Sequence, residues 1–121
     1  MDKIELQERL KCFALRLVPL CQALPGKKLC SIIEVQLLKS GFSAAANYRS
    51  ACNAQTKKAF LAKLSIALEE IDECVFWLEM IRDANLLPFS KIEAILQEGT
   101  ELTKILGASR RTATNKLTID N

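Results

Sequence analysis

The chain has 121 residues, half of them hydrophobic, with few glycines and prolines and a net charge of +3 at pH 7. This length and composition describe one domain with a hydrophobic core and exclude a disordered chain. No apolar run approaches the roughly 20 residues that span a bilayer, and the first residues are acidic and amphipathic, unlike a secretory signal. We therefore expect a cytoplasmic protein that does not enter a membrane.

The side chains that usually carry catalysis or bind metals are scarce. Histidine is absent, and the five cysteines form no C-x-x-C pair. We interpret the thiols as small apolar core or interface residues in a reducing compartment. No Gly-rich phosphate loop and no nucleophile with an evident partner is present, so we expect no enzyme, no cofactor and no metal site.

The first predicted helix covers about residues 3–24 and ends at Pro25-Gly26. Its apolar residues recur every four or three positions and form one stripe: Leu6, Leu10, Phe13, Leu17, Leu20 and Leu24.

The second predicted helix, about residues 27–52, is apolar on more than one side. One side holds Leu29, Ile33 and Leu37, and other sides hold Ile32, Val35, Leu38 and Phe42. Such a helix is usually buried on more than one side. In a chain this short, we expect that a second subunit supplies the additional burial.

The third predicted helix, about residues 56–84, begins at Thr56 as N-cap and ends near Asn85, which tolerates a left-handed backbone. Its heptad-like stripe predicts a bundle seam: Phe60, Leu64, Ala67, Ile71, Cys74, Leu78 and Ile81.

The fourth predicted helix, about residues 90–112, opens with a capping box from Ser90 to Glu93. Its stripe consists of Ile92, Ile95, Gly99, Leu102 and Leu106, and we expect residues 113–121 to be a frayed tail. Four amphipathic helices with short connections favour an all-α, up-down-up-down antiparallel four-helix bundle in a single domain over residues 1–121.

Charge is strongly separated along the chain. Residues 35–68 and 102–119 contain no acid and together carry +9, while the rest of the chain carries −6. In the predicted topology, the turn between the second and third helices and the end of the fourth lie at one pole. The basic residues expected there are Arg49, Lys57, Lys58, Lys63, Arg110, Arg111 and Lys116. Such a pole is either a solvated basic face or a surface for the phosphates of RNA or DNA. Tyr48 is the only aromatic residue among these charges, which gives little support for base stacking.

The run from Gln36 to Ala51, with Ala-Asn-Tyr-Arg at its centre, resembles the signature of the 23S ribosomal RNA intervening-sequence protein family. The resemblance continues through residues 60–79 and extends weakly into residues 101–106. It implies a four-helix bundle that assembles into a ring-shaped homopentamer. One branch of the family, the accessory variability determinant of diversity-generating retroelements, binds nucleic acid and a reverse transcriptase. Where the family usually has Glu after Asn-Tyr-Arg, this chain has Ser50. If that Glu pairs with a neighbouring basic residue in relatives, the pairing is lost here and the positive charge of the site is less neutralised.

Other polar and aromatic residues have a structural and a functional interpretation. We expect Asn47 to be a buried amide that ties two helices together, in preference to a ligand contact. Phe76 and Trp77 are expected to be core residues or anchors of a subunit interface. The acidic group around Glu70 and Glu73 has no Glu-x-x-His pair for a metal, so it indicates an acidic face that could meet the basic pole of a neighbouring subunit.

The sequence therefore predicts a non-enzymatic homo-oligomer, a pentamer by resemblance, whose basic pole binds RNA or DNA. The alternative is a protein-interaction scaffold, for example an accessory subunit of a reverse transcriptase, that does not bind nucleic acid itself.

Overall fold

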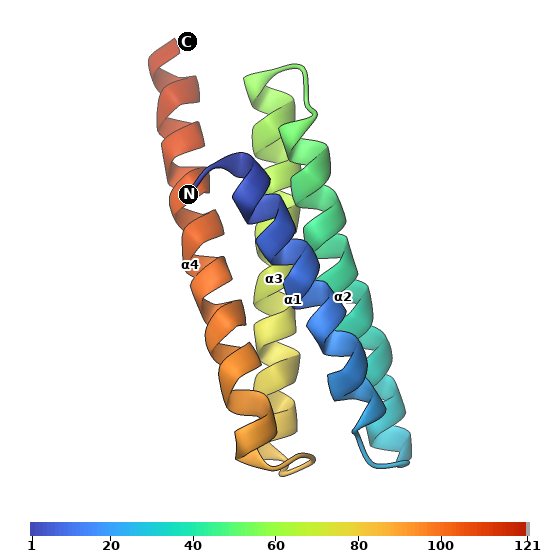
Figure 1. Ribbon diagram of the computed structural model, residues 1–121. Coiled ribbons are helices and arrows are strands. Elements are labelled where there is room, and N and C mark those ends of the chain that lie inside the picture. Colours follow the sequence, from blue (N-terminus) through green and yellow to red (C-terminus); the bar gives the residue numbers. More distant parts are fainter. Residues whose placement is uncertain (121) are drawn as a thin grey trace.

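A computed structural model describes residues 1–120 and places them in four helices. The helices are α1 (Lys3–Gln22), α2 (Lys28–Cys52), α3 (Lys57–Asp83) and α4 (Phe89–Asp120). Each helix packs against its neighbours in the chain, and α1 also meets α4, which closes the bundle (Figure 1). The all-α four-helix bundle expected from the sequence is confirmed.

Local capping explains where the helices begin and end. The Asp2 carboxylate accepts a hydrogen bond from the Glu5 amide at 2.8 Å, and the Thr56 hydroxyl accepts one from the Ala59 amide at 3.0 Å. Both bonds satisfy amides that a helix start leaves without a partner. After α3, Asn85 has φ of 56°, so its predicted left-handed conformation is confirmed.

Two predictions about α4 are wrong. The helix begins at Phe89, one residue before the expected capping box, so Ser90 lies inside it. Its far end continues to Asp120, whereas residues 113–121 were expected to fray; Asn121 lies outside the described residues. Ala113 packs against the core, and the Thr118 hydroxyl donates to the Thr114 carbonyl, so the helix keeps support beyond the last residue of the apolar stripe.

The predicted stripes of α1, α3 and α4 form the core. Within them only Leu24 and Phe60 are partly exposed, and the rest are buried. From α2, the core takes Ile33 and Leu37 but not Leu29, which is half exposed.

Two glycines allow α1 to approach its neighbours closely. A Cβ atom at Gly41 of α2 would lie 2.3 Å from Cδ1 of Leu17, and one at Gly99 of α4 would lie 3.2 Å from Cζ of Phe13. The buried side chains of Leu17 and Phe13 therefore occupy space that any other residue at these two positions would fill.

A buried polar contact joins α2 to α3. The Ser40 hydroxyl donates to the Gln36 carbonyl at 2.8 Å and lies 3.2 Å from the Cys74 sulfur. Burial raises the pKa of the Cys74 thiol to about 12, so it remains a neutral core group. Asn47, by contrast, donates to the carbonyl and hydroxyl oxygens of Ser43 one turn earlier in the same helix, so the expected tie between two helices is wrong.

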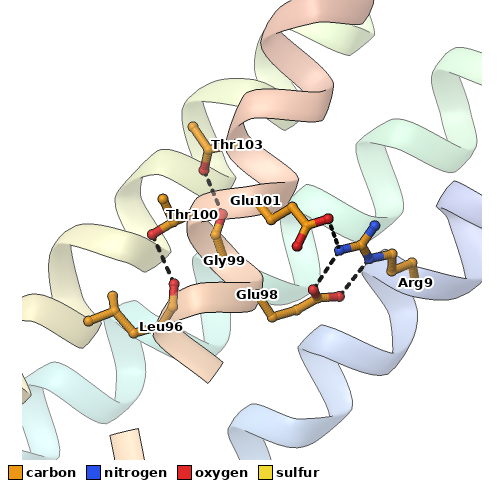
Figure 2. A network of polar contacts seen from close by, with 7 residues as sticks. All are labelled: Arg9, Leu96, Glu98, Gly99, Thr100, Glu101 and Thr103. Atoms are coloured by element: carbon orange, nitrogen blue, oxygen red, sulfur yellow. Dashed lines mark hydrogen bonds and ion pairs between the residues drawn. The ribbon is translucent and has the colours of Figure 1, made fainter. Parts of the chain in front are cut away.

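An ion-pair cluster joins α1 to α4 (Figure 2). The Arg9 guanidinium donates to both carboxylate oxygens of Glu98 at 2.8 and 2.7 Å and contacts Glu101 at 3.0 Å. This hydrogen bonding raises the pKa of Arg9 and lowers the pKa of Glu98. The cluster adds a polar contact to the packing of Phe13 beside Gly99 between the same two helices.

The outer face of α2 is unusually apolar. Leu29, Ile32, Val35 and Phe42 are each about half exposed or more and lie outside the core that the buried residues of this helix join. By length and composition α2 could cross a membrane, with a mean hydropathy of 1.2 over its most apolar window. Its inner face nevertheless packs against α1 and α3. The high hydropathy of α2 therefore comes from two apolar faces, one in the core and one on the outside of the bundle.

We expect Gly41→Val to lower the free energy of unfolding by about 1–3 kcal/mol, because the added side chain overlaps Leu17 in a packed core. The matched control is Gly107→Val on α4, where an added Cβ would meet only Arg111 at 3.9 Å, and we expect a change within about 0.5 kcal/mol. Urea denaturation measures both, and equal effects would contradict the close approach at Gly41.

We expect Glu98→Gln to destabilise the protein by about 0.5–1.5 kcal/mol at pH 7, since it weakens a bidentate pair that is only partly exposed. The folded-state pKa of Glu98 is depressed, so its contribution is complete above the unfolded value near 4.5 and is lost as the pH falls through the folded value. Urea denaturation at pH 7 and at about pH 3 should therefore show the difference from the unsubstituted protein shrinking in acid. Asp83→Asn weakens an exposed ion pair between sequence neighbours, so it should change the free energy of unfolding little at either pH. A destabilisation by Glu98→Gln that does not depend on pH would contradict the ion pair between Glu98 and Arg9.

Candidate nucleic-acid interface at the basic pole

A cavity of about 820 Å³ lies at the pole where α1 begins. Residues from all four helices and from the α2–α3 turn line it. Figure 1 shows that α4 and the α2–α3 hairpin continue beyond the start of α1. The cavity is therefore the part of the bundle that α1 is too short to fill.

The inner wall of the cavity is apolar and partly aromatic. Leu6, Ile105, Tyr48 and Phe60 contribute to it, and of the two aromatic residues only Phe60 is partly exposed. Burial raises the pKa of Tyr48, and a side-chain hydrogen bond with Cys52 adds to this effect. The phenol therefore stays neutral at physiological pH and retains its proton for hydrogen bonding.

The cavity is also lined by polar and cationic side chains. Lys3, Lys57 and Lys116 reach it from three different helices. The Lys3 ammonium lies 4.4 Å from the centroid of the Phe60 ring, in a cation–π contact. Asp2 is the one acidic residue among those that line the cavity, and its carboxylate already accepts the Glu5 amide.

Two lysines stand at the start of α3, where the helix dipole is positive. Lys57 and Lys58 occupy its first turn, which contains no acid. Cations at this end of a helix are electrostatically unfavourable, whereas an anion bound there is stabilised by the free amides and the dipole. The local arrangement therefore favours an anionic partner at the mouth of the cavity.

The structure brings only some of the predicted basic residues to the cavity. Lys57 and Lys116 line it, whereas the remaining five are exposed outside its lining: Arg49, Lys58, Lys63, Arg110 and Arg111. Arg111 extends back along α4, since its Nη1 atom would lie 3.9 Å from a Cβ atom at Gly107. The five exposed residues thus belong to the surface around the pole, and their role in binding stays a prediction.

Sequence reasoning missed Lys3 and Phe60. Lys3 lies between Asp2 and Glu5, so it is not part of an acid-free segment of the sequence. The up-down-up-down topology offered a signal, because it places the start of the first helix at the same pole as the second turn. Phe60 was assigned to the core, but it is partly exposed and also lines the cavity, which gives the site a second aromatic ring beside Tyr48.

The four candidate interface residues lie on α3, some distance along the helix from the cavity. Phe76 is 47% exposed, and Glu73 is exposed on the same face. Trp77 packs against its own core and meets Phe76 edge to face at 5.0 Å, and its buried indole N–H has no hydrogen-bond partner among the described residues. Burial, followed by repulsion from Glu73, raises the pKa of Glu70, and the nearby Lys39 offsets part of this effect.

Comparison with known proteins gives a consistent result. The chain matches the model of the family described as 23S rRNA-intervening sequence protein over residues 2–108. It is also similar to the crystal structure of a protein of unknown function from the S23 ribosomal protein family of Bacteroides thetaiotaomicron. The TM-score is 0.79 at 32% identity, and the similarity covers 87% of this chain and 97% of that one. No functionally curated protein matches the chain.

Proposed function

The chain belongs to the family of 23S rRNA-intervening sequence proteins, and from this premise we propose that it is a non-enzymatic assembly protein whose basic pole binds RNA or DNA. The solved relative has no known function, so the proposal rests on the chemistry of this chain. The family description, which refers to a segment of ribosomal RNA, agrees with a nucleic-acid partner but does not identify one.

The observation that carries the proposal is the convergence of cations from separate helices on one cavity. Lys3, Lys57 and Lys116 are far apart in the sequence, and Asp2 is the one acidic residue among those that line the cavity. Phosphates neutralise such a group of cations and gain further from the amides at the start of α3. Lys58 and Arg110 extend the same positive surface beyond the cavity.

A homo-oligomer is the second part of the proposal. The outer face of α2 exposes Ile32, Val35 and Phe42, and the outer face of α3 exposes Ile66 and Phe76. Contiguous exposed apolar side chains are typical of protein interfaces. A ring that associates through these apolar faces leaves the basic pole open for nucleic acid, and a pentamer is the expected state.

The same apolar faces favour a second candidate function. They would also serve a scaffold that binds another protein, such as a reverse transcriptase, without contacting nucleic acid. The two candidates differ in one property: only the first requires binding to polyanions that weakens steeply with salt.

We expect structured RNA and duplex DNA to bind with micromolar or tighter affinity at low salt, and the affinity to fall linearly on a log–log plot against salt concentration. Fluorescence anisotropy measures this directly. Replacing Lys57 and Lys58 together by Gln should reduce the slope of log affinity against log salt concentration by about two, because each lost phosphate contact lowers that slope by about one.

The matched control for this pair is Lys27→Gln with Lys28→Gln. These lysines are the N-cap and the first residue of α2, at the opposite pole, and their replacement should leave the slope unchanged. Equal effects of the two double variants would reject the basic pole as the binding surface. No binding by the unsubstituted protein at low salt would reject the nucleic-acid role and favour the scaffold.

We expect sedimentation equilibrium to show an assembly several times larger than the 13.5 kDa chain, and Phe76→Glu to weaken it at least tenfold by placing a charge in an apolar interface. Phe89→Glu is the control, since Phe89 is similarly exposed but lies at the start of α4. A 13.5 kDa species at micromolar concentration for the unsubstituted protein would contradict the homo-oligomer, and an unchanged mass for Phe76→Glu would remove Phe76 from the interface.

A further inference from the structure

The cavity at the basic pole has a composition that a phosphate-binding surface does not need. A surface that only attracts phosphates needs cations alone, whereas this one is a half-open cavity of about 820 Å³ lined by two aromatic residues as well as three lysines. Cavities of this size, mostly apolar with a few polar groups, are typical of sites for small organic groups. The combination indicates a ligand that is both planar and anionic.

We propose that the cavity receives one unstacked base of a single-stranded nucleic acid, with the adjoining phosphates held by the lysines at its rim. This inference rests on the proposed function and adds a preference for unpaired over duplex nucleic acid. In a duplex, the bases are stacked inside the helix and cannot enter a cavity, whereas single strands present bases that stack on aromatic side chains.

The polar groups at the rim suit the edge of a base. Gln55, Ser109 and Thr112 line the cavity with an amide and two hydroxyl groups, which can both donate and accept hydrogen bonds. A fatty acid would use the apolar wall and one cation, but it would make no use of these hydrogen-bonding groups. A nucleotide uses the aromatic wall, the hydrogen-bonding groups and the cations together.

Lys3 has a specific part in this arrangement. Without ligand, its ammonium covers the Phe60 ring at 4.4 Å. A base that stacks on Phe60 takes the place of the ammonium, and the released cation then lies close to the phosphate of the same nucleotide. The exchange is favourable because stacking on an aromatic side chain and an ion pair with phosphate replace one exposed cation–π contact.

The test compares a single-stranded RNA octamer that carries one 2-aminopurine with a blunt duplex of the same sequence, at one low salt concentration. We expect the single strand to bind more tightly and the 2-aminopurine fluorescence to change on binding. Phe60→Ala should weaken single-strand binding about 10- to 100-fold, the range expected for the loss of one stacked base, and leave duplex binding unchanged. Phe89→Ala removes an equally aromatic but exposed residue outside the cavity and should have no effect.

A second variant keeps the test independent of the core packing of Phe60. Ser109→Phe fills the cavity from α4 without removing a charge or an aromatic ring, and it should produce the same selective loss. Unchanged single-strand binding in Ser109→Phe and in folded Phe60→Ala would overturn the base-binding cavity while leaving the proposed function intact. Displacement of the RNA by decanoate but not by adenosine monophosphate would also overturn it, in favour of an amphiphile site. Failure of the unsubstituted protein to bind either RNA would instead reject the proposed function.

Discussion

The candidate site depends on how α1 packs between α2 and α4. Gly41 and Gly99 leave space on the two neighbouring helices, and the buried side chains of Leu17 and Phe13 occupy it. Packing of this kind fixes the position of α1 along the bundle, because a shift in either direction would remove both side chains from the space beside a glycine. The Arg9 ion pairs with Glu98 and Glu101 hold the same helix against α4 from the solvent side (Figure 2).

That position determines where the candidate site forms. Contacts near the middle of α1 fix its position, and the helix begins at Lys3. Its first turn therefore lies short of the pole that α4 and the α2–α3 hairpin reach (Figure 1). The unfilled space becomes a cavity, and Lys3 lies at its edge because the helix starts there. Packing in the core thus leaves a cavity at the end of the molecule, lined by aromatic residues and lysines.

The two surfaces of interest are separated along the bundle. Cations gather at the pole, while exposed apolar side chains such as Val35 and Phe76 and the carboxylates of Glu70 and Glu73 lie along the outer faces of α2 and α3. This separation allows subunit contact and ligand binding to use different parts of the surface. If neighbouring subunits associate through the helix faces, their poles remain open and their positive fields add.

The sequence by itself determined the fold class, three of the four core stripes and the Thr56 and Asn85 caps, because helical periodicity and capping are local and depend on residues only a few positions apart. It misjudged the end of α4, where support comes from packing at Ala113 and not from a continued stripe, and it misread Asn47, whose partner proved to be one turn away. Only the tertiary structure decided that Lys3, Phe60 and Lys116 share a cavity with Tyr48. Their proximity depends on how far each helix extends past its neighbour, and that length difference is set by contacts between helices, which no local pattern in the sequence encodes.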